Sequence, residues 1–162
     1  MPSPAEIVRA CLVGQGIVAV PPLPGQILQL DPLPGDASVL CFVGSMPDEP
    51  DKLVALYDEA GLYFGRRQRD GRSLGHPGVK IIVRTPDYSG YAFMKTLAAG
   101  LDTVVKSTVS VPISDVQNED HYLQSVYRTS LIISLGEEKH KRRQLWSLHA
   151  RVAFQDSETF SG

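Results

Sequence analysis

The sequence predicts an α+β fold: a mixed, mostly antiparallel sheet with an N-terminal helix and one long helix packed on one face. Two changes of hydrophobic period indicate this fold. Apolar residues alternate in segments 79–84 and 145–154, as in strands, whereas after Asp87 they recur every three or four residues, as in a helix. The order helix, strands, helix, strands contains no series of βαβ units, so a parallel α/β sheet is not expected.

The N-terminal helix is expected to begin in a capping box. Residues 3–6, "SPAE", place a hydroxyl before the helix, a proline in its first turn and a carboxylate three residues on. Residues 14–16, "GQG", end the helix and do not follow a strand, so they are not a dinucleotide-binding fingerprint. The apolar face of this helix consists of Ile7, Val8, Cys11 and Leu12.

The next segment, 18–37, contains five prolines and two glycines and cannot form a long helix. We expect this segment to be extended, with a short strand at 26–30. Strands are then expected at 38–44, 52–58 and 79–84, with a turn "SMPDEPD" after the first and a long loop, 62–76, after the second.

The long helix is expected to follow Pro86 directly, with Thr85 or Asp87 as its cap. Gly100 inside it indicates a close approach to the sheet. One stripe of the helix carries Tyr91, Met94, Leu97, Ala98, Leu101 and Val105.

Strands return after the long helix, at 107–114, within 122–135 and at 145–154. The last two flank a charged hairpin loop, 136–144, "GEEKHKRRQ". The chain is therefore expected to form one domain over residues 1–156, followed by a flexible tail at 157–162.

Composition favours a soluble single domain. The chain has 162 residues, 43% of them apolar, and a net charge of −2, which excludes a global basic field for nucleic acid. Cys11 and Cys41 are predicted to be reduced core thiols, because two cysteines are too few for a disulfide framework or a structural zinc site. Residues 1–16 do not have the pattern of a signal peptide, and no apolar run is long enough to span a membrane, so assembly in the cytoplasm is expected.

No catalytic, cofactor-binding or metal site is predicted, and the chain is not expected to be an enzyme. The strand–turn–helix junction at 84–87 lacks the serine of a nucleophile elbow, and its proline removes an amide that a phosphate loop would need. The histidines show no metal-binding spacing; they are His76, His121, His140 and His149.

One acidic cluster leaves an alternative open. Its carboxylates could form turns and solvated strand ends, or could bind a metal or perform acid–base chemistry in a small ligand-binding α+β enzyme. The cluster consists of Asp48, Glu49, Asp51, Asp58 and Glu59.

Two basic loops are the candidate contact surfaces. Segment 65–72, "GRRQRDGR", has a balance of +3, and segment 137–143, "EEKHKRR", has +2. They are either solvated loops or contacts to an acidic partner or a nucleic acid, although no aromatic residues alternate with the arginines to stack on bases. The candidate partner or lumen contacts are Arg66, Arg67, Arg69, Arg72, Lys139, Lys141, Arg142 and Arg143.

Several short motifs resemble those of phage minor capsid proteins that act as tail terminators in long, non-contractile-tailed phages. They are "MPDEPD" at 46–51, "YDEAG" at 57–61, "PGVKIIVR" at 77–84, the helix at 87–101 and the hairpin at 135–154. The sequence departs from the family pattern at 59–61, where Thr-Gly-Gly is expected, and in its longer proline-rich stretch at 21–34.

The resemblance implies a structural virion protein without cofactors. Such proteins form a ring, typically a hexamer, that caps the tail tube, stops its polymerisation and meets the head connector, with DNA passing through the lumen without sequence-specific recognition. The expected partners are further copies of the chain, the tail tube protein and a head-connector or head-completion protein, at the neck of the virion. Loops 62–76 and 136–144 are the expected contacts. A head-completion or connector protein of the same neck region is the alternative within this class.

Overall fold

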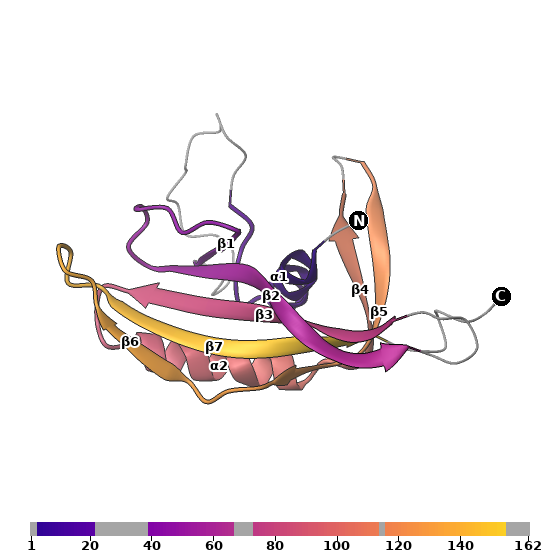
Figure 1. Cartoon of the computed structure of the whole chain (residues 1–162). Helices are drawn as coiled ribbons and strands as arrows, with labels where there is room; N and C mark the ends of the chain where they lie inside the picture. The colour runs from indigo at the N-terminus through magenta and orange to yellow at the C-terminus, as the bar shows by residue number, and fades with distance from the viewer. Residues whose placement is uncertain (1–2, 22–38, 67–72, 114–115, 155–162) are drawn as a thin grey trace.

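The computed structural model describes residues 3–21, 39–66, 73–113 and 116–154, with side chains left out of the description from 60 to 75. These residues form two helices and one sheet of seven strands (Figure 1). The elements are α1 (Pro4–Gly14), β1 (Leu40–Val43), β2 (Leu53–Arg66), β3 (Ser73–Thr85), α2 (Gly90–Asp102), β4 (Val105–Pro112), β5 (Asn118–Arg128), β6 (Ile133–Glu137) and β7 (Gln144–Phe154).

The sheet is mixed and mostly antiparallel, which confirms the predicted α+β class. Its strand order is β1-β2-β3-β7-β5-β4, and only the β1–β2 pair is parallel. β7 is flanked by β3 on one side and, on the other, by β5 along 150–154 and by β6 along 144–147. The single candidate strand within 122–135 is therefore two strands, β5 and β6.

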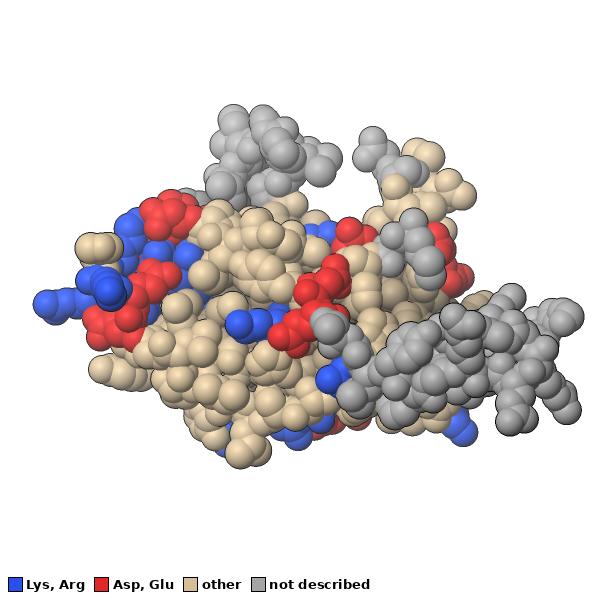
Figure 2. Space-filling model, in the orientation of Figure 1, with Lys and Arg blue, Asp and Glu red and all other residues tan. Residues whose placement is uncertain are grey.

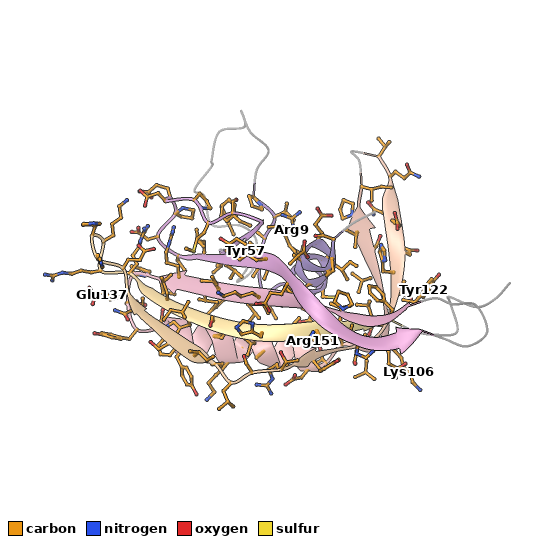
Figure 3. All side chains as sticks on the ribbon, in the orientation of Figure 1. Arg9, Tyr57, Lys106, Tyr122, Glu137 and Arg151 are labelled. Atoms are coloured by element: carbon orange, nitrogen blue, oxygen red, sulfur yellow. The ribbon has the colours of Figure 1, made fainter. Side chains whose placement is uncertain are left out.

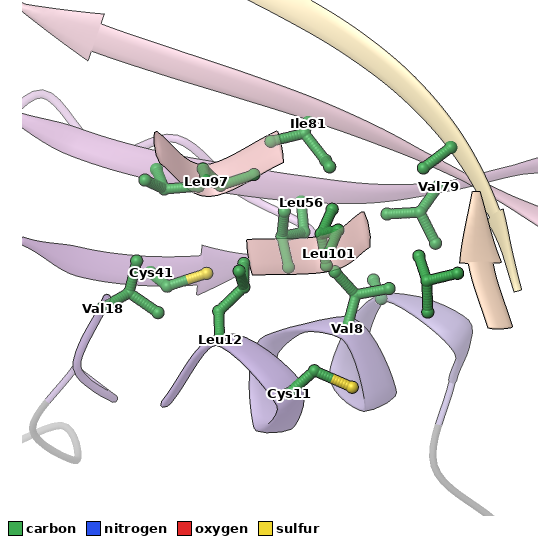
Figure 4. Packing of buried hydrophobic residues seen from close by; sticks show 14 of the residues in the cluster. Val8, Cys11, Leu12, Val18, Cys41, Leu56, Val79, Ile81, Leu97 and Leu101 are labelled. Atoms are coloured by element: carbon green, nitrogen blue, oxygen red, sulfur yellow. The ribbon is translucent and has the colours of Figure 1, made fainter. Parts of the chain in front are cut away.

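Both helices contribute to one hydrophobic core on the same face of the sheet (Figure 4). The register places Leu56, Ile81 and Leu148 side by side in β2, β3 and β7, and all three belong to this core. Cys11 and Cys41 are buried free thiols, as expected, and burial raises their pKa values to about 11 and about 12. The thiols are therefore protonated at neutral pH and serve as packing groups.

Helix α1 begins where the capping box predicts. The Ser3 hydroxyl accepts a hydrogen bond from the Glu6 amide at 3.3 Å. A second acceptor comes from the sheet, because the Asp58 carboxylate on β2 binds the Ala5 amide at 2.9 Å. Two of the free amides of the first turn are thus satisfied, one of them by a strand distant in sequence.

The predicted loop 62–76 is mostly β-structure. β2 continues to Arg66 and β3 begins at Ser73, and the two remain paired out to that end of the hairpin. Residues 62–64, "LYF", favour a strand by their own propensity, and this signal outweighs the arginines and glycines that suggested a loop. Residues 67–72 and the short strand expected at 26–30 lie outside the described residues, as does the expected tail.

Helix α2 starts later than predicted, at Gly90, and neither Thr85 nor Asp87 caps it. The Asp87 carboxylate instead accepts the Ser89 amide at 2.9 Å in an Asx-type turn, and the Thr85 hydroxyl donates to the Asp87 carbonyl at 2.7 Å. Ser89 occupies the N-cap position without a side-chain hydrogen bond. The proline therefore initiates a turn before the helix rather than the helix itself.

The apolar stripe of α2 is confirmed for its central residues and wrong at its ends. Tyr91 and Val105 are 45% and 58% exposed; Tyr91 packs against Trp146, and Val105 already belongs to β4. Gly100 closely approaches the end of α1, at Gln15 and Ile17, and not the sheet. The buried residues of the stripe are Met94, Leu97, Ala98 and Leu101.

Substituting Gly90 by alanine is expected to lower the free energy of unfolding by about 1–3 kcal/mol, because the site is already filled. A Cβ at Gly90 would lie 2.6 Å from Trp146 Cδ1 and 2.7 Å from Thr85 Oγ1. Gly100→Ala is the matched control, because its Cβ would meet the ends of the Gln15 and Ile17 side chains while alanine favours the helix. Urea denaturation measures both variants, and equal losses would contradict this account of Gly90.

Candidate functional site: an arginine clamp at one end of the sheet

Three segments that are distant in sequence meet at one end of the sheet: the turn 46–51, the end of β3 and the turn between β6 and β7. Figure 2 shows their charged side chains gathered at the left of the view, and Figure 3 labels Glu137 at this end. We call the central group the arginine clamp. It consists of Arg84, Arg143, Asp48, Asp51 and Glu138.

Arg84 fixes the backbone of the turn. It is 1% exposed, and its Nη2 donates to the carbonyl oxygens of Pro47, Asp48 and Pro50 at 2.7, 3.1 and 2.6 Å. Its Nε donates to the Asp51 carbonyl at 3.3 Å. One guanidinium therefore contacts four backbone acceptors of residues 47–51, with Nη2 sharing its two N–H groups among three of them, and so stabilises this conformation of the turn. Burial, together with the nearby positive charge of Arg143, lowers the pKa of Arg84.

Arg143 joins the turn to the β6–β7 hairpin. It is 4% exposed, and its Nε donates to Glu138 Oε2 at 2.7 Å within the hairpin. Its Nη2 lies 3.0 Å from Asp48 Oδ1, and its Nη1 lies 3.2 Å from Asp51 Oδ1. Lys141 also pairs with Asp48, and the hydrogen bonds from Lys141 and Arg143 lower the pKa of the Asp48 carboxyl. The clamp is thus a network of charge-assisted hydrogen bonds between segments more than 80 residues apart.

The surroundings of the clamp carry no net charge, although the hairpin alone is basic. The five cations there equal the five carboxylates, so the +2 of the hairpin is cancelled by the turn and β3. The cations are Arg84, Lys139, Lys141, Arg142 and Arg143, and the carboxylates are Asp48, Glu49, Asp51, Glu137 and Glu138.

The candidate contact residues of the hairpin thus fall into three groups. Arg143 is used inside the chain, Lys141 is partly exposed and paired, and Lys139 and Arg142 are exposed at the hairpin tip. The side chain of Arg66 and the whole of Arg67, Arg69 and Arg72 lie outside what the structure describes. The buried role of Arg84 was missed from the sequence, where it was only the last residue of a strand.

The acidic cluster 48–59 is not one site. Asp48 and Asp51 belong to the clamp, Asp58 caps α1, and the Glu59 carboxylate lies 2.8 Å from His149 Nδ1 on the opposite face of the sheet. Among the described residues, no three histidine, cysteine or acidic side chains are placed to share a metal ion. His76 contacts the Tyr127 hydroxyl at 2.7 Å instead.

Removing the carboxylate of Asp58 is expected to destabilise the docking of α1. Asp58→Ala leaves the Ala5 amide without its acceptor, and loss of a helix cap costs about 1 kcal/mol. Asp58→Asn keeps an acceptor oxygen and should recover part of this loss. Thermal and urea unfolding measure both variants. The exposed Asp120→Ala is the control, and a loss as large as that of Asp58→Ala would contradict the capping role.

A shallow groove lies between α1 and the β4 end of the sheet, where Figure 3 labels Arg9. Its apolar lining includes Val13, Val20, Val111 and Ile113.

No helix in the described part of the chain has the length and apolarity to cross a bilayer.

Comparison with known proteins finds similarity in structure and not in sequence families. No family model and no curated protein matches the chain. The structure is similar to a chain in the solved structure "Virion of native gene transfer agent (GTA) particle", with a TM-score of 0.41 and 17% sequence identity. The match covers 72% of this chain and 78% of that chain.

Proposed function

We propose that this chain is a structural protein of a phage-type particle, acting as a tail terminator. Copies of it form a ring, hexameric as in the proteins that it resembles, at the end of the tail tube. The ring stops polymerisation of the tube and joins it to the head connector, with DNA passing through the lumen.

The observation that carries this proposal is the convergence of the resemblance motifs. "MPDEPD" forms the turn at 46–51, "PGVKIIVR" supplies Arg84 at its end, and the hairpin 135–154 supplies Arg143. Short motifs in three separate parts of the chain thus form one bonded unit, the arginine clamp. Such a unit accounts for why these residues occur together, and it supports a common fold with the tail terminators.

The clamp also refines which surfaces are proposed to contact partners. The five residues of the clamp carry −1 (2 − 3), and the ten charged groups at this end of the sheet sum to zero, so this end has no surplus of positive charge to offer to DNA or to an acidic neighbour. The surplus lies in the connection between β2 and β3, where residues 65–72 carry +3. We assign the lumen or neighbour contact to that connection. Lys139 and Arg142 are exposed at the hairpin tip, but neighbouring carboxylates offset their charge, so we assign them a second, weaker contact.

Electron microscopy of tail tubes tests the proposal. Purified protein is added to tubes assembled without it, followed by further tube protein, and tube lengths are measured. We expect density at one end of each tube and no further elongation, whereas the same tubes without the chain should keep growing. Continued growth would overturn the proposal. Binding of the chain to heads instead of tubes would also overturn the proposal, and would indicate a head-completion protein.

A further inference from the structure

β6 has one unpaired edge and carries apolar side chains that are exposed to solvent. Within the described residues it pairs with β7 alone, so its other edge has no partner strand there. Leu131, just before the strand, and Ile133 and Leu135 within it are 85%, 45% and 46% exposed. Ile133 pairs with Ser147, and Leu135 lies in the register shift between Ser134 and Gly136, so these side chains line the exposed edge without strict alternation. An open edge beside an apolar stripe is the arrangement that another strand covers.

The exposed stripe lies on the face of the sheet opposite to the helices. The register places Ile133 beside Ser147, and Ser147 beside Ile82. Ile82 belongs to the small cluster of the second face and not to the core beneath α1 and α2. Figure 2 shows this face toward the viewer, with a broad uncharged area beside the charged end. The partly buried Tyr57 and Leu145 continue the apolar surface.

A second open edge lies on the other side of the sheet. β1 covers β2 only along residues 53–56, and no strand in the described part of the chain pairs with the outer edge of β2 from 57 to 66. Among the described residues, the sheet therefore has open edges on β6 and on β2 from 57 to 66, which lie on different strands, and the outer edge of β4 is unpaired as well (Figure 1). Unpaired strand amides and carbonyls are complementary to another strand and to few other surfaces.

We propose that β6 of one copy pairs with the outer edge of β2 in the next copy, so that the sheet continues from subunit to subunit. A contact between two different edges is heterologous, and repeated contacts of this type close into a ring when the rotation between neighbouring copies closes, and otherwise extend into a filament. The closed ring rests on the proposed function, whereas the two open edges are properties of the chain itself.

The distribution of charge agrees with this head-to-tail contact. Residues 65–72 carry +3, and since the whole chain carries −2, the remainder carries −5 (−2 − 3). Two copies of the connection between β2 and β3 repel each other, so the charge disfavours a symmetric contact between these connections and is compatible with a head-to-tail one.

Sedimentation velocity and hydrogen–deuterium exchange, from micromolar to millimolar concentrations of the purified chain, test this contact. The chain is expected to self-associate, and the amides of 131–135 and 57–66 should exchange more slowly as it does so. β4 should be unaffected. The double substitution Ile133→Glu/Leu135→Glu is expected to weaken association at least about tenfold, because it buries two charges in the contact. Val105→Glu is the control, since Val105 is at least as exposed as these two residues but lies on β4.

Each contrary result overturns the inference. The inference is wrong if the wild-type chain stays monomeric at millimolar concentration, or if it assembles while the amides of 131–135 still exchange fast. It is also wrong if the double variant, with its fold verified by circular dichroism, assembles as well as the control. Protection of β6 only on adding tail tube protein would assign this edge to the tube instead. If the chain assembles through β6 but fails to cap tubes, the proposed function fails and this contact stands.

Discussion

Arg84→Ala is expected to lower the free energy of unfolding by about 3 kcal/mol, the largest effect of any single substitution at the clamp. The guanidinium is buried and donates to four backbone carbonyls of the turn 47–51. Without it, these carbonyls lose their donors, and Asp48 and Glu138 lose a nearby positive charge. The variant should also increase amide exchange in 46–52, which a simple loss of packing volume would not do selectively.

Urea denaturation of Arg84→Ala, Arg84→Lys and Lys139→Ala separates the contribution of the charge of Arg84 from that of its hydrogen-bond geometry. Lysine restores the charge but not the fork of donors, so it should recover only part of the lost free energy. Lys139 is exposed at the hairpin tip, and its substitution should change the free energy of unfolding by less than about 0.5 kcal/mol. A loss below about 1 kcal/mol for Arg84→Ala would contradict the clamp.

Arg143→Ala is expected to cost about 2 kcal/mol, although it lies in a loop that looks solvent-exposed from its sequence. Its guanidinium bonds Glu138 within the hairpin and Asp48 and Asp51 across it. Two of these carboxylates are largely exposed, which limits the cost relative to Arg84.

The neighbouring residue gives the matched control for Arg143. Arg142 is exposed, and Arg142→Ala should leave the free energy of unfolding within about 0.5 kcal/mol of wild type. Urea denaturation in low and high salt measures both variants. Equal stability of the two would show that Arg143 is free for a partner, as the sequence suggested, and would remove it from the clamp.

The features that were predicted correctly from the sequence are those that depend on local residue spacing. The capping box at 3–6, the alternation in 79–84 and 145–154 and the burial of Leu97 and Leu101 all depend on spacing within a short window. The N-terminus of α2 was missed because Thr85, Asp87 and Ser89 compete as turn and cap residues, and the structure uses the first two in the turn.

The clamp could not be derived from local pattern, because its partners lie far apart. Asp48 and Arg143 are separated by 95 positions, and only the order of strands in the sheet brings them together. A buried arginine at the end of an apolar strand and a turn of alternating acids and prolines each have common local explanations. The resemblance to tail terminators rests on both motifs, but it does not show that they are in contact.

Tail length in particles assembled without this chain is the measurement that tests its proposed function most directly. An early stop codon in its gene leaves the tail tube protein and the head proteins intact. The account predicts tubes of variable, excessive length that are not joined to filled heads, and restoration of uniform tails when the chain is supplied from a plasmid. Tails of normal, fixed length attached to heads in its absence would contradict the account.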